Sequence, residues 1–149
     1  MIALKTIDIM EDVQQILESL PLSEKIIDTM IEAGYLLGCA GKYEEAESCF
    51  RSILALQPDR IGGWLGLGNV LLMRGEIEES ERAYETVLEV DPSDPAARAF
   101  LGELYLCSGR IETGREILDS VYRDFPNLYV GRWAWNLLQL SREVMVCKE

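Results

Sequence analysis

Hydrophobic residues recur along the chain with the spacing of an amphipathic helix. Trp64, Leu67 and Leu71 follow one another at intervals of three and four positions, which places them on one face of a helix. After Gly75, a second segment keeps apolar residues on one stripe and acidic residues on the other as far as Val90. Glycine tolerates the left-handed backbone that commonly follows a helix end, so a turn is expected at Gly75. The pattern predicts two antiparallel helices that form a hairpin.

This hairpin pattern returns every 34 residues. Three series of residues keep the spacing: Pro58, Pro92 and Pro126; Gly41, Gly75 and Gly109; and Gly34, Gly68 and Gly102. They divide the chain, without insertion or deletion, into units 27–60, 61–94 and 95–128. A single hairpin cannot bury its apolar face, so the units are expected to stack into an all-α solenoid.

Two further helices are expected at the ends of this array. Residues 5–19 place apolar side chains on one stripe and acidic or amide side chains on the opposite one, and residues 128–146 have the pattern of a closing helix. Residues 1–149 are therefore expected to form a single domain. Three roles stay open for the N-terminal helix: it caps the first unit, pairs with a second copy of the chain in a homodimer, or lies against the inner surface of the solenoid.

Charge and composition disfavour several classes of function. The chain has 14 Lys and Arg against 26 Asp and Glu, a net charge of −12, which disfavours binding to nucleic acid or to an anionic membrane surface. It has no histidine, and its glycines lack the spacing of a phosphate-binding loop. We therefore expect a protein that is not an enzyme and that uses no cofactor and no metal.

The cysteines and the start of the chain bear on its location. Cys39, Cys49, Cys107 and Cys147 form no C-x-x-C pair, and the first residues reach Asp8 too soon for the apolar core of a signal peptide. No apolar run approaches the ~20 residues that cross a bilayer. The expectation is a cytoplasmic protein with reduced thiols.

The repeated unit resembles the tetratricopeptide repeat. That family has a large residue at position 4, leucine or alanine at 7, glycine at 8, tyrosine or leucine at 11, a small residue at 20, an aromatic or leucine at 24 and proline at 32. The matching residues are Met30, Ala33, Gly34, Leu37, Ala46, Phe50 and Pro58; then Trp64, Leu67, Gly68, Leu71, Ser80, Tyr84 and Pro92; then Leu101, Gly102, Tyr105, Leu118 and Pro126. Arg98 and Gly114, at positions 4 and 20 of the third unit, depart from the pattern. The resemblance implies a right-handed superhelix of helix hairpins that binds another protein.

The resemblance also implies that the first helix of each unit lines a concave groove. The residues expected to contact a partner there are Ile31, Tyr35, Cys39, Leu65, Asn69, Leu72, Met73, Ala99, Glu103 and Leu106. Most of them are apolar, which suits an extended or helical segment with aliphatic anchors. The sequence does not decide whether Leu65, Leu72 and Leu106 stay open or pack against neighbouring helices.

Two functions are compatible with this groove. Family members that grip the acidic tails of heat-shock chaperones use a clamp of Lys, Arg and Asn, of which only Asn69 is present here. Small acidic proteins of about three such repeats serve in type III secretion, and this chain resembles them in size, charge and repeat number. The resemblance implies a cytosolic chaperone for a translocator or needle subunit. The alternative is a scaffold subunit within a larger multiprotein complex.

Overall fold

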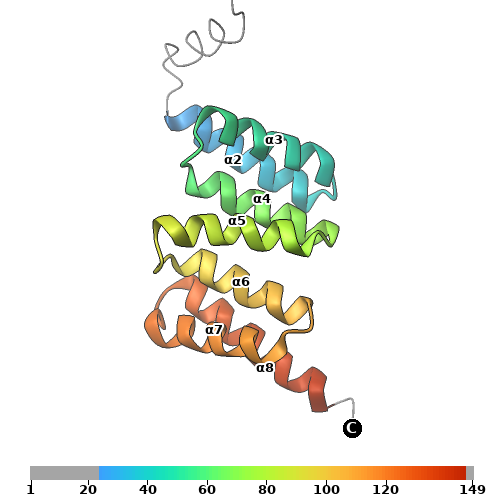
Figure 1. Cartoon of the computed structure of the whole chain (residues 1–149), viewed down its shortest axis with the longest axis vertical. Helices are drawn as coiled ribbons and strands as arrows, with labels where there is room; N and C mark the ends of the chain where they lie inside the picture. Colours follow the sequence, from blue (N-terminus) through green and yellow to red (C-terminus); the bar gives the residue numbers. More distant parts are fainter. Residues whose placement is uncertain (1–23, 147–149) are drawn as a thin grey trace, which may run out of the picture.

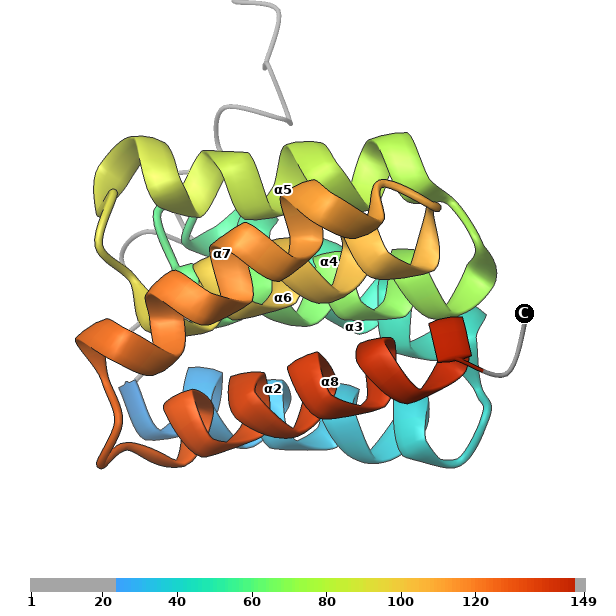
Figure 2. The same cartoon turned by 90° about the horizontal axis from the view of Figure 1, so that it is seen from below.

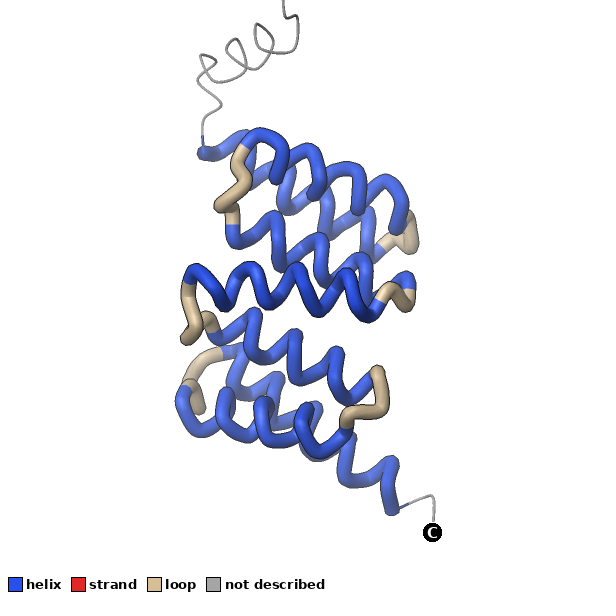
Figure 3. Tube along the Cα trace, in the orientation of Figure 1, coloured by secondary structure: helices blue, strands red, loops and turns tan. Residues whose placement is uncertain are grey.

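The computed structural model describes residues 24–146, and the regular structure in this part of the chain is entirely helical (Figure 3). In chain order the helices are α2 (Glu24–Cys39), α3 (Tyr43–Leu56), α4 (Ile61–Arg74), α5 (Ile77–Val90), α6 (Pro95–Cys107), α7 (Ile111–Asp124) and α8 (Tyr129–Val146). Three hairpins, α2 with α3, α4 with α5 and α6 with α7, stack along one axis, and α8 follows at the end (Figure 1). The protein is the all-α solenoid that the repeat predicts. The helix expected over residues 5–19 lies outside the described residues.

One periodic glycine series forms the turns of the hairpins. Gly41, Gly75 and Gly109 have φ angles of 76°, 80° and 85°, in the left-handed region that glycine adopts without steric cost. The N–H of Gly75 donates to the carbonyl oxygens of Leu71 and Leu72 and so closes the end of α4. The spacing of this series therefore records where each hairpin turns.

A second glycine series lets the two helices of each hairpin approach closely. A Cβ added at any of these positions would fall inside van der Waals distance of a large side chain on the partner helix: Phe50 at Gly34, Tyr84 at Gly68 and Leu118 at Gly102. The α4–α5 contact is close enough for the buried Ser80 hydroxyl to donate to the carbonyl of Gly68 at 2.7 Å. Small residues here are a requirement of packing, as the sequence pattern indicates.

Local side-chain contacts stabilise the start of α6. A carboxylate oxygen of Asp94 accepts a hydrogen bond from the backbone N–H of Ala97 at 2.7 Å, which satisfies a free donor at the helix end. Pro95 occupies the first helical position, where its missing N–H costs no hydrogen bond.

Aromatic side chains connect the second hairpin to the third and to α8. The rings of Tyr84 and Phe100 lie with centroids 5.7 Å apart, and Phe100 meets Trp133 edge to face at 5.3 Å. Both pairs join residues on different hairpins, or on a hairpin and α8. These contacts fix the orientation of the third hairpin relative to the second, and of α8 relative to the third hairpin.

The last helix covers the apolar end of the third hairpin. Ala134 and Leu138 on α8 are fully buried in one cluster with Ala99, Leu118 and Val121. Without α8 these side chains of α6 and α7 would face water. The segment 128–146, expected as a closing helix, thus contains a helix that buries this end of the array.

A polar contact also joins the second hairpin to the third. The Tyr105 hydroxyl donates to Oε1 of Glu81 at 2.7 Å, and the Arg110 guanidinium donates to both oxygens of the same carboxylate at 3.0 and 2.8 Å. Arg110 also lies over the Tyr105 ring, 3.9 Å from its centroid. The hydrogen bonds from Arg110, helped by Tyr105 and opposed by desolvation, hold the pKa of Glu81 below its usual value.

This contact should make part of the stability depend on pH. Because the pKa of Glu81 is lower in the folded chain, its carboxylate stabilises the fold above about pH 4 and loses that effect as the pH falls through the folded value. Arg110 is 43% exposed, so solvent screening keeps the expected cost of Glu81→Gln near 1 kcal/mol of unfolding free energy at neutral pH. Thermal melts of both proteins should differ at pH 7 and converge towards about pH 3. Glu79→Gln is the control, because its 3.6 Å pair with Arg51 is exposed on both sides. A difference that stayed constant with pH would contradict this assignment.

Candidate functional site

The stacked hairpins form an arc with an inner and an outer side. Figure 2 shows α5 on one side of the molecule, α2 and α8 on the other, and α4 and α6 between them. Figure 1 places α2 and α8 at opposite ends of the stack. Because α2 contacts α4, α4 contacts α6 and α6 contacts α8, these four helices form one side of the stack, which we call the concave side; we call the side of α3, α5 and α7 the convex side.

Nine of the ten residues expected on the concave side retain exposed surface. Tyr35 is 37% and Met73 56% exposed, and Cys39 is also exposed. Six more are partly exposed: Ile31, Leu65, Asn69, Leu72, Glu103 and Leu106. We call these nine residues, together with the exposed Cys107 on α6, the concave face.

Ala99 is a correction to the expected set. It is 0% exposed because α8 lies over this part of α6 and packs Ala134 and Leu138 against it. A partner protein cannot reach it while α8 is in place. The sequence analysis placed it correctly on the first helix of the third unit, and it is the following helix that removes it from the surface.

The aliphatic residues of the concave face both support the core and remain accessible. Leu65 and Leu72 pack against the cluster of Tyr84, Leu101 and Leu104, yet each keeps exposed surface. Ile31 packs in the same way on the cluster of the first hairpin, and Leu106 on the cluster beneath α8. The sequence left open whether Leu65, Leu72 and Leu106 are exposed or packed against neighbouring helices. The structure shows both, because one part of each side chain packs on the core and another part remains exposed.

A polar group forms the centre of the concave face. The side chain of Tyr84, which is fully buried, donates its hydroxyl to Oδ1 of Asn69 at 2.6 Å. Burial raises the pKa of Tyr84, and the nearby Glu103, Tyr35 and Cys107 raise it further. These groups come from α2, α4, α5 and α6, so the fold gathers them around one point. The Asn69 amide N–H₂ is left to donate to a bound chain.

Tyr84 is a residue of the candidate site that the sequence analysis did not identify. Its place in the repeat marks it as a core aromatic, and its ring is indeed buried. The tyrosine side chain is long enough for its hydroxyl to cross the core and reach Asn69. The sequence did contain a signal for this contact: a tyrosine in the second helix of the hairpin follows an asparagine in the first helix by fifteen positions.

Glu103 is an isolated carboxylate on this surface. Desolvation by the surrounding residues raises its pKa, and it makes neither a hydrogen bond nor an ion pair with another residue in the described range. Burial, and then the charge of Glu103, also raise the pKa of the Cys107 thiol. The thiol is therefore less readily ionised than a free cysteine, which argues against a nucleophilic role.

Three arginines on or next to α4 and α6 pair with carboxylates outside the concave face. Arg60 pairs with Glu24 and Asp28, and Arg74 pairs with Glu47 and Glu76. Arg98 reaches across to Ser120 and to Asp124 on α7. The concave face itself contains no lysine or arginine, so it offers an acidic ligand no ion pair.

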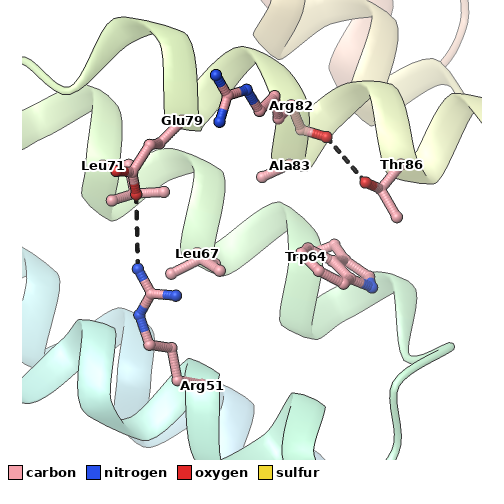
Figure 4. Close-up of a pocket in the computed structure, with 8 residues that line it drawn as sticks. All are labelled: Arg51, Trp64, Leu67, Leu71, Glu79, Arg82, Ala83 and Thr86. Atoms are coloured by element: carbon pink, nitrogen blue, oxygen red, sulfur yellow. Dashed lines mark hydrogen bonds and ion pairs between the residues drawn. The ribbon is translucent and has the colours of Figure 1, made fainter.

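A small pocket lies on the convex side, between α3, α4 and α5 (Figure 4). Its volume is about 260 Å³, and Leu67, Leu71 and Ala83 form its floor. Arg51 and Glu79 pair across its rim at 3.6 Å. This volume is below that of most small-molecule sites, and the rim charges already satisfy each other.

A larger hollow of about 610 Å³ lies against the outer surface of α8. It is lined by Tyr122, Pro126, Tyr129, Arg132, Trp133, Trp135 and Asn136. The rings of Tyr122 and Trp135 pack with centroids 4.8 Å apart. The hollow lies between the end of α7 and the first half of α8, at the end of the array.

Residues 24–146 contain no group of three or more Cys, Asp or Glu side chains that could hold a metal ion. No helix within the described range combines the length and apolarity required to span a membrane.

Comparison with known proteins gives a family and a set of similar structures. The family model of the tetratricopeptide repeat matches residues 31–81 and 65–128. The Yersinia enterocolitica type III secretion translocator chaperone SycD superposes with a TM-score of 0.71 at 18% identity, over 80% of this chain and 92% of SycD. PcrH from Pseudomonas aeruginosa, in complex with the chaperone binding region of PopD, gives 0.68 at 20% identity, over 83% of this chain and 96% of PcrH. No curated protein sequence matches the chain.

A protein with a different ligand has a similar fold. The first such repeat domain of Spaghetti (RPAP3), bound to the HSP90 peptide SRMEEVD, gives a TM-score of 0.67 at 16% identity, over 86% of this chain and 99% of that domain. At such low identity the comparisons establish the fold and leave the ligand open. The residues of the concave face have to indicate what binds there.

Proposed function

Because the chain belongs to the tetratricopeptide repeat family, we propose that it is a small acidic chaperone of a type III secretion system. Its concave face holds an apolar segment of a translocator or needle subunit before export. The observation that carries the proposal is the composition of this face, which is mainly aliphatic, aromatic and thiol-bearing, with no lysine or arginine. The structural likeness to SycD and PcrH supports it.

The chemistry of the face fits an apolar polypeptide. Tyr35 and Met73 offer accessible apolar surface of the adaptable kind that suits varied aliphatic anchors. Asn69, oriented by Tyr84, can donate to a backbone carbonyl of an extended chain. Covering an adhesive segment in this way, with a net charge of −12 to keep the complex dispersed, is what an export substrate requires.

The same composition argues against an HSP90-type ligand. A peptide such as SRMEEVD carries several carboxylates, which need cations on the receptor. The side chains of the concave face that would meet these carboxylates are mainly apolar, and the carboxylate of Glu103 would repel an acidic chain.

Photocrosslinking in the source organism tests the proposal. With p-benzoylphenylalanine in place of Tyr35, light should link the chain to one small partner encoded with a secretion apparatus. The same group in place of the exposed Tyr129, which begins α8 and does not belong to the concave face, is the matched control and should not capture that partner. Deletion of the chain should then leave the partner degraded or insoluble.

Two outcomes would contradict this function. Crosslinking from Tyr129 and not from Tyr35 would place the partner outside the concave face. Sedimentation of the chain only within a large stable assembly, with no separate complex of chain and partner, would favour the scaffold alternative.

A further inference from the structure

We infer that the segment bound on the concave face carries a lysine or arginine between its apolar anchors, positioned to pair with Glu103. The inference rests on the proposed function and specifies the chemistry of the partner. It follows from Glu103, which is the one charged side chain among the ten residues of the concave face.

Glu103 lies near the middle of the concave face. Glu103 lies one helical turn before Cys107 on α6, and its charge raises the pKa of both Tyr84 and Cys107; Tyr84 in turn contacts Asn69 on α4. Tyr35 reaches the same region from α2. The carboxylate is thus near the phenol of Tyr84 on α5 and the thiol of Cys107 on its own helix, and it is already half-buried in the free chain.

A bound apolar segment would remove the remaining water from this carboxylate. An ionised carboxylate left buried without a partner is strongly destabilising, so the ligand must either force its protonation or supply a positive charge. A cation at this point converts the unfavourable group into a charge-assisted hydrogen bond, the strongest kind of polar contact in an interface. The inference commits to the second arrangement.

Within residues 24–146, the arginines on the helices of the concave face already have partners. Arg74 and Arg98, which lie on the same helices as the concave face, are engaged with Glu47 and with Asp124 on neighbouring helices. No positive side chain in the described residues is close enough to lower the pKa of Glu103, whose shift has desolvation as its cause. We therefore expect the partner to supply the positive charge.

The experiment selects ligands without assuming the partner's identity. A phage-displayed library of random dodecapeptides is panned against the immobilised wild-type chain, Glu103→Gln and Glu116→Gln. Glu116 is exposed on α7 and makes no ion pair within the described range. Glu116→Gln is therefore the control, because it removes the same charge at a position outside the concave face. Peptides from the wild type and from Glu116→Gln should carry Lys or Arg between apolar residues, and peptides from Glu103→Gln should not.

A double-mutant cycle then measures the pairing. One selected peptide and its version with Gln at the basic position are titrated against the wild type and against Glu103→Gln. Loss of either charge should weaken binding about tenfold, and loss of both should weaken it little further. Both variants should unfold at the wild-type temperature or above it, because Glu103 makes no ion pair that its substitution would break.

The other outcomes separate this inference from the proposed function. Apolar peptides without basic residues, equally enriched on the wild type and on Glu103→Gln, would overturn the inference and leave the apolar binding face intact. Peptides that bind Met73→Asp as well as the wild type would show that the concave face is not the ligand site, and would overturn both.

Discussion

Substitution of Gly131 by alanine is expected to lower the unfolding free energy by about 3 kcal/mol and the melting temperature by about 10 °C. An added Cβ at this position would overlap the backbone carbonyl oxygen of Phe125 and lie 2.8 Å from its carbonyl carbon. Backbone cannot rotate aside as a side chain can, and this carbonyl also accepts from the N–H of Leu128. Helix α8 would have to shift off the cluster of Ala99 and Leu118 that it buries.

Gly38→Ala is the matched control for this prediction. Gly38 is also a buried helical glycine, but a Cβ there would meet only a methyl group of Val70 at an ordinary 3.8 Å. Alanine restricts the unfolded chain more than glycine does, so this variant should be as stable as the wild type or about 0.5 kcal/mol more stable. Thermal melts measure both, and hydrogen exchange should locate the Gly131→Ala loss in α7 and α8. Equal melting temperatures for the two variants would mean that α8 does not approach residue 125 so closely.

The fold could be predicted because its steric requirements recur at a fixed period. The turn at Gly75 and the close crossing at Gly68 each return in the other hairpins, so a pattern of three makes them visible. Gly66 shows the limit of this reasoning. It adjoins the ring of Phe50, which fills the space between α2 and α4, but the equivalent positions hold Glu32 and Phe100. A close contact that occurs once leaves no periodic signal.

The candidate site could be predicted in part, because position in a repeat fixes the helix face but not what covers it. Tyr35 and Met73 are exposed as expected, whereas Ala99 is buried by a helix that begins thirty residues later. The isolation of Glu103 depends on where the arginines reach. Arg98 precedes it on the same helix, and only the position of α7 directs that arginine to Asp124. The burial of Ala99 and the isolation of Glu103 both depend on tertiary contacts, which the local spacing of residues in the sequence does not reveal.

The end of the array shows the same distinction. Two repeat lengths after Leu67, Gly68 and Leu71, which pack α4 against α5, stand Trp135, Asn136 and Gln139 on α8. The glycine that allows close approach is replaced by a larger polar residue, and the tryptophan packs on Tyr122. Helix α8 therefore resembles the first helix of a further unit whose contact surface for a second helix has been altered. This agrees with its position, where it buries the apolar end of the third hairpin.

A single acidic substitution on the concave face, Met73→Asp, should reduce affinity for the partner at least about 100-fold. Met73 is 56% exposed on α4, so the change removes little core packing and the fold should keep its helical content and melting temperature. In the complex, the new carboxylate would lose its water among apolar groups, with Glu103 as a second negative charge on the same face. Leu72→Glu is a poorer test, because Leu72 packs on Tyr84 and Leu104 and its loss would unfold the second hairpin.

Calorimetric titration with the segment captured from Tyr35 measures the Met73→Asp effect, and two matched variants define it. Met73→Leu keeps an apolar side chain of similar volume and should bind within about threefold of the wild type. Val90→Asp makes the same kind of change at a residue that is 68% exposed near the end of α5, on the convex side, and should bind as the wild type does. If Met73→Asp and Val90→Asp weakened binding equally, the effect would be one of net charge, and the partner would not lie against Met73. A loss confined to Met73→Asp places the apolar segment on the concave face, beside the carboxylate of Glu103.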